Sequence, residues 1–332
     1  MLATDGSHQG RSQLRSIVSR GSCIPVRHRA GPALRVEAGV NQDRSKLRPD
    51  CPNCAGLCCV ALPFAASADF AIDKAAGEPC PHLQTDFRCR IHSHLRERGF
   101  PGCAAYDCYG AGQKITQSTF AGQDWRRNPG IAQRMFAVVP IVQTLHELLW
   151  YLADALTFEA AGSLHPELVQ ARDEIEHLAD QGPDALVSLD IRVCRRDVEV
   201  LLDRASALVR EDAGRQYRRR HPRPQRPGPR RGRRALDLAG AELPGVDLVG
   251  ADLRGALLIG TNLRAADLQG ADVRAADFRN SDLRGADLGG CVYLTQSQLD
   301  AARGDAATKV PPLLRRPPHW STRADGTRVN RP

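Results

Sequence analysis

A five-residue period dominates the last third of the sequence. Between positions 236 and 290, eleven consecutive units place Leu, Val or Phe at their central position, from Leu238 to Leu288. The position two residues earlier is usually small, as at Ala241 and Ala266. A period of five fits neither the α-helical turn nor the alternation of a single extended strand. We therefore expect a chain that turns a corner every five residues, with four units in each square coil and both apolar positions inside.

The repeated units, such as ADLRG, ADLQG and SDLRG, resemble those of the pentapeptide-repeat family. The resemblance implies a right-handed quadrilateral β-helix over residues 236–295, about three coils long. Residues 296–320, which end at Trp320, resemble the tail that follows the repeats in many bacterial members. We expect this tail to cap the last coil, which would otherwise expose a sheet edge and an apolar core. Cys291 stands at a small inward position, where we expect packing rather than chemistry.

The outward positions of the repeat carry nine acidic residues and five arginines, a net charge of −4. Some longer members of the family are taken to mimic DNA and to bind DNA gyrase. Three coils at ~4.8 Å each make a stack only ~14 Å tall, which matches about four base pairs. The interleaved arginines also interrupt the negative field. We therefore expect a protein-interaction surface, and keep a DNA-mimicking gyrase binder as an alternative.

Cysteine is the other unusual feature, because eight of the eleven cysteines fall within residues 51–108. The sequence has no recognisable export signal, so we expect a cytoplasmic, reducing compartment, where such density favours a metal over disulfides. In the stretch CPNCAGLCC, either a helix or a metal knuckle would let the first two cysteines share an ion. The candidate metal ligands are Cys51, Cys54, Cys58, Cys59, Cys80, Cys89, Cys103 and Cys108. Cys194 is expected to be a free, buried cysteine.

The order of these cysteines resembles that of bacterial zinc- or iron-chelating domains with a CxxCxxxCC cluster. His92 stands where that family usually has Tyr, and two residues separate Arg98 from Pro101 where the family has Arg-Pro. The resemblance implies metal binding, with zinc favoured and iron or an iron–sulfur cluster as the alternative. Cys108 lies outside the part that aligns. A zinc site would add folding free energy of order 10 kcal/mol to a region with little apolar core.

The predicted fold class is multidomain α+β. Apolar residues at helical spacing, such as Leu145, Leu148 and Leu152, predict helices, with a kink or break at Pro140. No stretch of the sequence approaches the roughly 18 apolar residues that a membrane helix needs. The expected organisation is a disordered basic tail (1–49), a Cys-rich metal-binding module (50–125), a helical region packing on it (126–213), an Arg/Pro-rich linker (214–235), the β-helix (236–295), its cap (296–320) and a disordered tail (321–332).

The linker has ten arginines and no acid. We interpret it as a spacer, with contact to nucleic acid as the alternative.

The sequence HELLW at 146–150 begins like a zincin motif but has Trp150 in place of the second His, so His146 is expected to be an ordinary surface residue. No catalytic set is recognisable.

The leading interpretation is a non-catalytic, cytoplasmic adaptor in which a metal stabilises the N-terminal module and the β-helix presents a surface to a protein partner. Two alternatives remain open. One is a metal- or iron–sulfur-dependent protein-modifying enzyme, because a flagellin lysine methylase carries a related cysteine cluster. The other is a thiol- or metal-based redox sensor.

Overall fold

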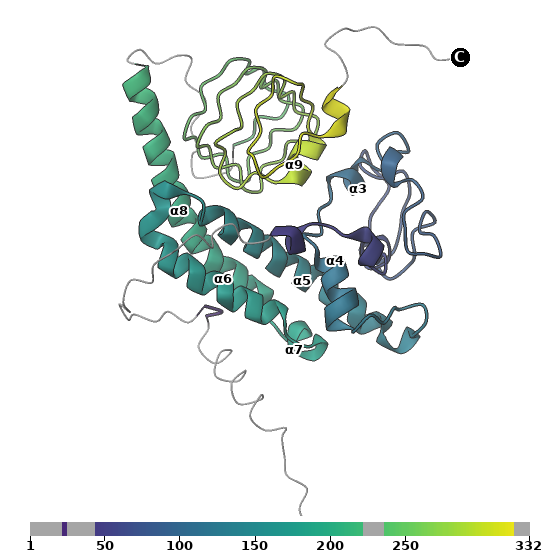
Figure 1. Ribbon diagram of the computed structural model, residues 1–332. Coiled ribbons are helices and arrows are strands. Elements are labelled where there is room, and N and C mark those ends of the chain that lie inside the picture. The colour runs from purple at the N-terminus through teal and green to yellow at the C-terminus, as the bar shows by residue number, and fades with distance from the viewer. Residues whose placement is uncertain (1–21, 25–43, 222–235, 322–332) are drawn as a thin grey trace, which may run out of the picture. The chain divides into compact units, whose positions relative to one another are not determined.

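The computed structural model describes residues 22–24, 44–221 and 236–321 (Figure 1). The described residues form two compact units. The first unit contains the described residues up to Pro63, together with Ala75–Cys89 and Cys108–Arg204. The second contains Phe64–Lys74, Arg90–Asp107 and the described residues from Ala205 onward. The chain therefore crosses between the units several times.

The helical part of the first unit consists of α5 (Pro129–Ala155), α6 (His165–Ala179), α7 (Pro183–Val187) and the first part of α8 (Ile191–Arg220). Each of α5, α6 and α7 has a proline in its first turn, where the missing N–H group would have had no helical partner anyway. Helix α5 packs against both α6 and α7 (Figure 1). Its side chains therefore supply the centre of this unit.

Helix α5 runs through Pro140, so the predicted break at this residue is absent. Buried Leu145, Leu148 and Leu152 follow in the next turns, each at most 1% exposed. The expectation that no stretch approaches a membrane helix does not hold for α5, the one helix among the described residues whose length and composition would suffice to cross a membrane. Because most of that window is buried inside the protein, we interpret α5 as a core helix.

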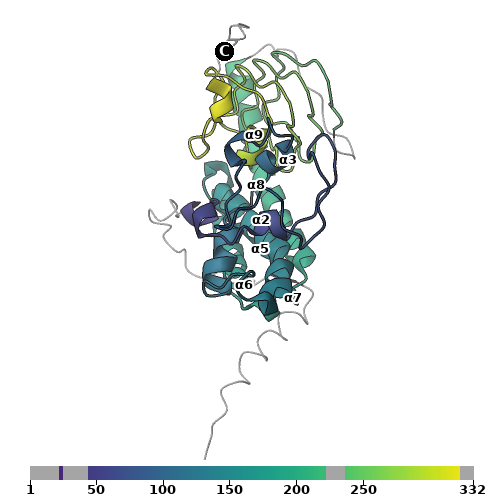
Figure 2. The same cartoon turned by 90° about the vertical axis from the view of Figure 1, so that its right-hand side faces the viewer.

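Short helical segments complete both units. In the first unit these are η1 (Arg44–Leu47), η2 (Cys51–Asn53), α2 (Leu57–Val60), α4 (Ala111–Gln113), the π-helical η4 (Lys114–Thr119) and η5 (Glu159–Leu164). In the second unit they are η3 (His92–His94), α3 (Pro101–Ala105), α9 (Gln296–Ala301) and η6 (Pro318–Ser321). Within the second unit α3 packs against α9, as Figure 2 shows.

The repeat forms a four-sided coil whose parallel bridges join residues 20 positions apart. One side is defined by Asp237, Leu257 and Asp277. The other sides carry the ladders Glu242–Asn262–Asp282, Asp247–Asp267–Asp287 and Asp252–Asp272–Val292. The 20-residue register means that four five-residue units make one turn, as the period predicts.

The core of the coil is formed by the central residue of each unit. Leu253, Leu258, Leu263 and Leu268 are all fully buried. The series continues into a twelfth unit, in which Tyr293 occupies the central position and is also fully buried. The residues that end the units from Gly240 to Gly285 have a positive φ, which glycine adopts freely. Ala265 adopts the same conformation with φ 55°.

The C-terminal segment caps the last coil. Arg303 bridges to Asp282 and Lys309 bridges to Asp287, so two sides of the open sheet edge gain a further strand pairing. Helix α9 begins with a capping box formed by Thr295 and Gln298. Trp320 is 1% exposed in the same segment. These contacts satisfy the edge and cover the core, which is the capping role expected from the sequence.

The structure shortens the expected linker. Helix α8 extends to Arg220, so residues 214–220 are helical, and residues 222–235 lie outside the described part of the chain. The extension has a local cause, since arginine is a good helix former. Arg215 also pairs with Glu211 at 3.0 Å and Gln216 donates to Asp212 at 2.7 Å, both four residues apart. The expected tails 1–49 and 321–332 likewise lie mostly outside the described residues.

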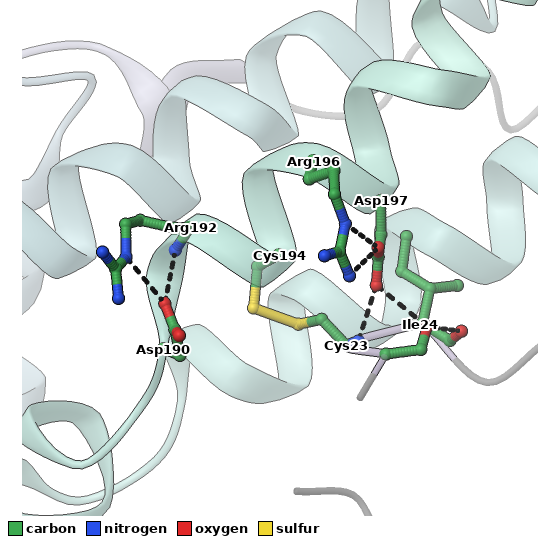
Figure 3. Close-up of a disulfide and its surroundings, with 8 residues drawn as sticks. Cys23, Ile24, Asp190, Arg192, Cys194, Arg196 and Asp197 are labelled. Atoms are coloured by element: carbon green, nitrogen blue, oxygen red, sulfur yellow. Dashed lines mark hydrogen bonds and ion pairs between the residues drawn. A yellow bond between two sulfur atoms is a disulfide. The ribbon is translucent and has the colours of Figure 1, made fainter. Parts of the chain in front are cut away.

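A disulfide joins Cys23 to Cys194 across 171 residues of sequence (Figure 3). Both cysteines are buried, and Cys194 lies on α8. The Asp197 side chain accepts hydrogen bonds from the backbone N–H of Cys23 at 2.7 Å and from the Ser22 hydroxyl at 2.8 Å (Figure 3). The expectation that Cys194 is a free cysteine is therefore wrong. Its partner lies in the segment that the sequence assigned to a tail.

We expect the double variant Cys23→Ala/Cys194→Ala to lower the free energy of unfolding by about 2–5 kcal/mol, because the crosslink closes a long loop in the unfolded chain. Urea unfolding with and without dithiothreitol would measure this. The reductant should destabilise the wild type and a Cys291→Ala control, and leave the double variant unchanged. Identical unfolding of wild type and double variant in the absence of reductant would contradict the crosslink.

Candidate functional site

The cysteine-rich stretch 51–59 is not a single helix. Residues Cys51–Asn53 form one 3-10 turn, and α2 begins only at Leu57. Between them Gly56 has φ +66°. A Cβ at this position would lie 2.7 Å from Leu83 Cδ1, so both the backbone conformation and the close packing require glycine here. The single helix considered from the sequence is therefore wrong, and the metal knuckle, its alternative, stays a prediction.

The thiols of this stretch lie near one another. The Sγ atoms of Cys58 and Cys59 are 3.9 Å apart. Burial raises the pKa of Cys51, and the neighbouring Cys58 and Cys54 thiols raise it further. Burial also raises the pKa of Cys54, whose Sγ packs closely against the backbone of Gly112. The contact with Cys59 raises the pKa of Cys58 well above the usual value. Without a nearby cation these three side chains are therefore neutral thiols at pH 7.

Backbone hydrogen bonds hold three further cysteines, and one of them, Cys80, is bonded directly to this stretch. The N–H of Cys80 donates to the carbonyl of Cys59 at 2.9 Å. Leu83 then forms an antiparallel bridge with Cys89, which closes a short hairpin-like loop. Cys108 accepts a hydrogen bond from Ala111 at 2.9 Å, at the start of α4. All of these residues belong to the first unit, whereas Cys103 lies on α3 in the second unit.

The donor chemistry of this region suits zinc or iron, because thiolates are ligands of both. The arrangement does not yet form a ligand set. In the described part of the chain, no three Cys, His, Asp or Glu side chains are placed so that they would hold a metal ion. The eight predicted ligands are also outside disulfides. Their role as metal ligands stays a prediction.

His146 is buried, so its interpretation as a surface residue is wrong. The side chain is 5% exposed, and its Nδ1 lies 2.7 Å from the carbonyl oxygen of Tyr109. Burial lowers the pKa of this histidine. The reason is the central position of α5, which is covered by neighbouring segments on more than one side. His146 is a hydrogen-bonded core residue that anchors the segment before α4.

The coil sorts the charges of the repeat by side, which the linear sequence does not display. Arg254 pairs with Asp252 at 2.7 Å, Arg279 with Asp277 at 2.7 Å and Arg284 with Asp282. The fourth side carries three stacked carboxylates and no arginine. We call this side, formed by Asp247, Asp267 and Asp287 with Val249, Gln269 and Gly289, the acidic face. The expected interleaving of arginines therefore holds on three sides and fails on this one.

Electrostatic repulsion along the acidic face is visible at its middle residue. Burial raises the pKa of Asp267, and the charges of Asp287 and Asp247 raise it further. At the capped end, Lys309 Nζ lies 2.8 Å from Asp287 and Gln269 donates to the same carboxylate at 3.0 Å. The uncompensated charge of this face is therefore concentrated at Asp247 and Asp267.

The side of the coil that carries Asp252 and Asp272 is covered by the second part of α8. Arg210 donates to the carbonyl of Gly250 at 3.1 Å and lies 3.6 Å from Asp252. Asp272 is fully buried beneath this contact, and its Oδ1 accepts the backbone N–H of Arg274 at 2.9 Å. Burial raises the pKa of Asp272, although Arg274, Ser206 and Arg254 oppose the shift. This side is structural rather than available to a partner.

Comparison with known proteins agrees with this geometry. The sequence matches the family described as pentapeptide repeats, in eight copies, over residues 235–268 and 256–292. The chain is 54% identical over 274 residues to the uncharacterized protein YybG of Bacillus subtilis (strain 168), which covers 82% of this chain and 95% of that protein.

Two crystal structures show more limited similarity. One is the pentapeptide repeat protein Rfr23 from the cyanobacterium Cyanothece 51142, with 33% identity over 23% of this chain and a TM-score of 0.21. The other is AT2G44920, a pentapeptide repeat protein from the Arabidopsis thaliana thylakoid lumen, with 28% identity over 24% of this chain and a TM-score of 0.13. The match spans about half of each of these chains, 52% and 54%.

The fold defines a protein with a helical N-terminal region and a C-terminal coil of five-residue repeats. With the family match and the relative in B. subtilis, the chain belongs to the pentapeptide-repeat proteins and is homologous to YybG.

The raised pKa of Asp272 leads to a pH-dependence. The folded state binds this proton more tightly than the unfolded state, so the stability of the wild type should fall as the pH rises from about 4 through the raised pKa. The variant Asp272→Asn removes this contribution. Urea unfolding between pH 4 and pH 8 should show its stability gaining on the wild type as the pH rises.

Asp237→Asn, at an exposed position of the same repeat, is the matched control. The difference in the free energy of unfolding between this control and the wild type should not increase with pH. A difference between Asp272→Asn and wild type that stays constant across the whole range would contradict the assignment.

Proposed function

We propose that this protein is a non-catalytic adaptor whose β-helix presents the acidic face to a protein partner. The observation that carries the proposal is the column of Asp247, Asp267 and Asp287, which share one side of the coil without an arginine. An arrangement of fixed, partly uncompensated like charges raises the energy of the free protein and favours a partner with basic side chains. The other three sides carry internal ion pairs or are covered.

The acidic face suits a protein partner better than it suits mimicry of DNA. Three carboxylates at a spacing of ~4.8 Å span only ~10 Å. A duplex presents charge on two strands over a much longer stretch. A short column is instead matched by a few Lys or Arg side chains on one partner element.

We further propose that the Cys-rich segments of the first unit bind a metal, with zinc favoured and iron or an iron–sulfur cluster as the alternative. Support comes from seven of the eight predicted ligands lying on segments of one unit, several of them tied together by backbone hydrogen bonds. In the segments 51–63 and 75–89, Leu57 and Val60 are the large apolar side chains that are buried, so these segments have little apolar core of their own. A bound metal would supply folding free energy to them.

The adaptor proposal is tested with the full chain carrying changes on the acidic face. In a proximity-labelling experiment in cells, Asp267→Asn/Gln269→Lys should lose the labelled partner. The control Leu257→Lys/Asn262→Lys adds the same net charge on two other sides and should retain it. Loss of the partner in both variants, or in neither, would contradict a role for the acidic face.

The metal proposal is tested by elemental analysis and a visible spectrum of anaerobically purified, full-length protein. Wild type and the control Cys291→Ser should contain about one or two equivalents of colourless zinc, and Cys54→Ser should contain less. Iron with acid-labile sulfide would favour the enzyme or sensor alternatives. The absence of metal from all three proteins would overturn metal binding and leave the adaptor proposal standing.

A further inference from the structure

The two ends of the β-helix differ. At the C-terminal end, the backbone N–H of Arg303 donates to Ser281 at 2.8 Å and that of Lys309 donates to Ala286 at 2.9 Å. The last coil is thus paired with further chain. The first coil has no comparable partner among the described residues, as its hydrogen bonds show.

Each coil pairs with the next through the same backbone groups. This pattern identifies the N–H and C=O groups of the first coil that have no partner among the described residues. In the second coil, the N–H of Asn262 donates to Ala241 at 2.9 Å, and its carbonyl accepts the N–H of Leu243 at 2.8 Å. Both backbone groups of Asn262 therefore face the preceding coil. The equivalent groups of Asp237, Glu242 and Asp247 in the first coil have no backbone hydrogen bond within the described residues.

The apolar interior is also less covered at this end. Leu238 and Leu243, the first two central residues, are only half-buried. The next central residues, such as Leu248 and Leu258, are at most 2% exposed. Within the described part of the chain, the first coil thus offers unpaired backbone groups beside accessible apolar side chains, which is the combination that a further strand would cover.

The rim of this end is acidic. Asp237 and Glu242 are exposed and Asp247 is half-buried. The second coil has Leu257 and Asn262 below the first two of these positions. On the side that carries Asp252 and Asp272, Asp252 is paired with Arg254 and Arg210, so that side is not part of the rim charge.

Charge argues against a second copy of this chain as the occupant. A second copy paired edge to edge would bring the same acidic rim against itself, and like charges on facing strands are destabilising. A chain with Lys or Arg at the positions opposite Asp237, Glu242 and Asp247 would gain favourable cross-strand pairs.

We infer that the open end of the first coil binds an extended, basic segment of a partner protein. The segment adds a parallel layer that bends at the corners of the coil. Its backbone pairs with the N–H and C=O groups of Asp237, Glu242 and Asp247, which have no partner among the described residues. Its basic side chains meet the three carboxylates, and its small apolar side chains cover Leu238 and Leu243. This surface is at the end of the coil. It shares Asp247 with the acidic face, but its binding does not require a partner on Asp267 or Asp287.

The test uses full-length protein and the labelled 15-residue probe AKLKGAKLKGAKLKG, which repeats the coil pattern with lysine in the outward positions. Fluorescence anisotropy should show that this probe binds to the wild type. The acidic analogue AELEGAELEGAELEG should not bind. The variant Asp237→Asn/Glu242→Gln/Asp247→Asn should bind the basic probe about tenfold more weakly. The control Asp173→Asn/Asp184→Asn/Glu199→Gln changes the net charge equally at exposed sites of the first unit and should bind like the wild type.

Hydrogen exchange locates the bound probe. The amides of Asp237, Glu242 and Asp247 should become protected on binding, while the already paired amides of the second coil should change little. The inference would be overturned if both triple variants bound the probe equally weakly, or if the wild type did not bind it. It would also be overturned if the probe bound without protecting these amides. A wild-type dimer in which the same amides are protected without probe would likewise overturn it. None of these results depends on Asp267 or Gln269, which test the acidic face.

Discussion

The backbone pairing between residues 20 positions apart organises the repeat and its surface. A strand of only a few residues on each side would be marginal alone. Stacked three times, each side gains hydrogen bonds such as those from Leu243 to Asn262, and from Asn262 to Ala241. The same stacking encloses the central leucines and sets one outward column above each side. Core, hydrogen bonding and surface charge therefore share a single register.

The sequence was most informative where structure is local. The five-residue period predicted the coil, its inward leucines and the need for a cap, because each of these follows from chemistry repeated within a few residues. The twelfth unit at Tyr293 departs from the usual composition, but the predicted bounds 236–295 include it because its spacing follows the period. The acidic face was also present in the spacing of Asp247, Asp267 and Asp287, but only a 20-residue comparison brings them together.

Features that depend on distant partners could not be predicted in this way. The pairing of Cys23 with Cys194 joins a segment outside every recognisable motif to the core of α8. The burial of His146 depends on which segments cover α5, and the helical spacing of apolar residues does not predict those segments. In the cysteine-rich stretch, motif spacing names donors but does not determine their directions, because Gly56 reverses the backbone between Cys54 and Cys58.

The four-unit turn also restricts how such a protein can change length during evolution. Removing one five-residue unit would move every later residue to the next side of the coil, a rotation of about 90° for a four-sided helix. The column of Asp247, Asp267 and Asp287 would then be divided between two sides, while the core positions would remain filled. Gain or loss of four units would preserve both. Selection for folding alone tolerates steps of five residues, whereas selection for this surface requires steps of twenty.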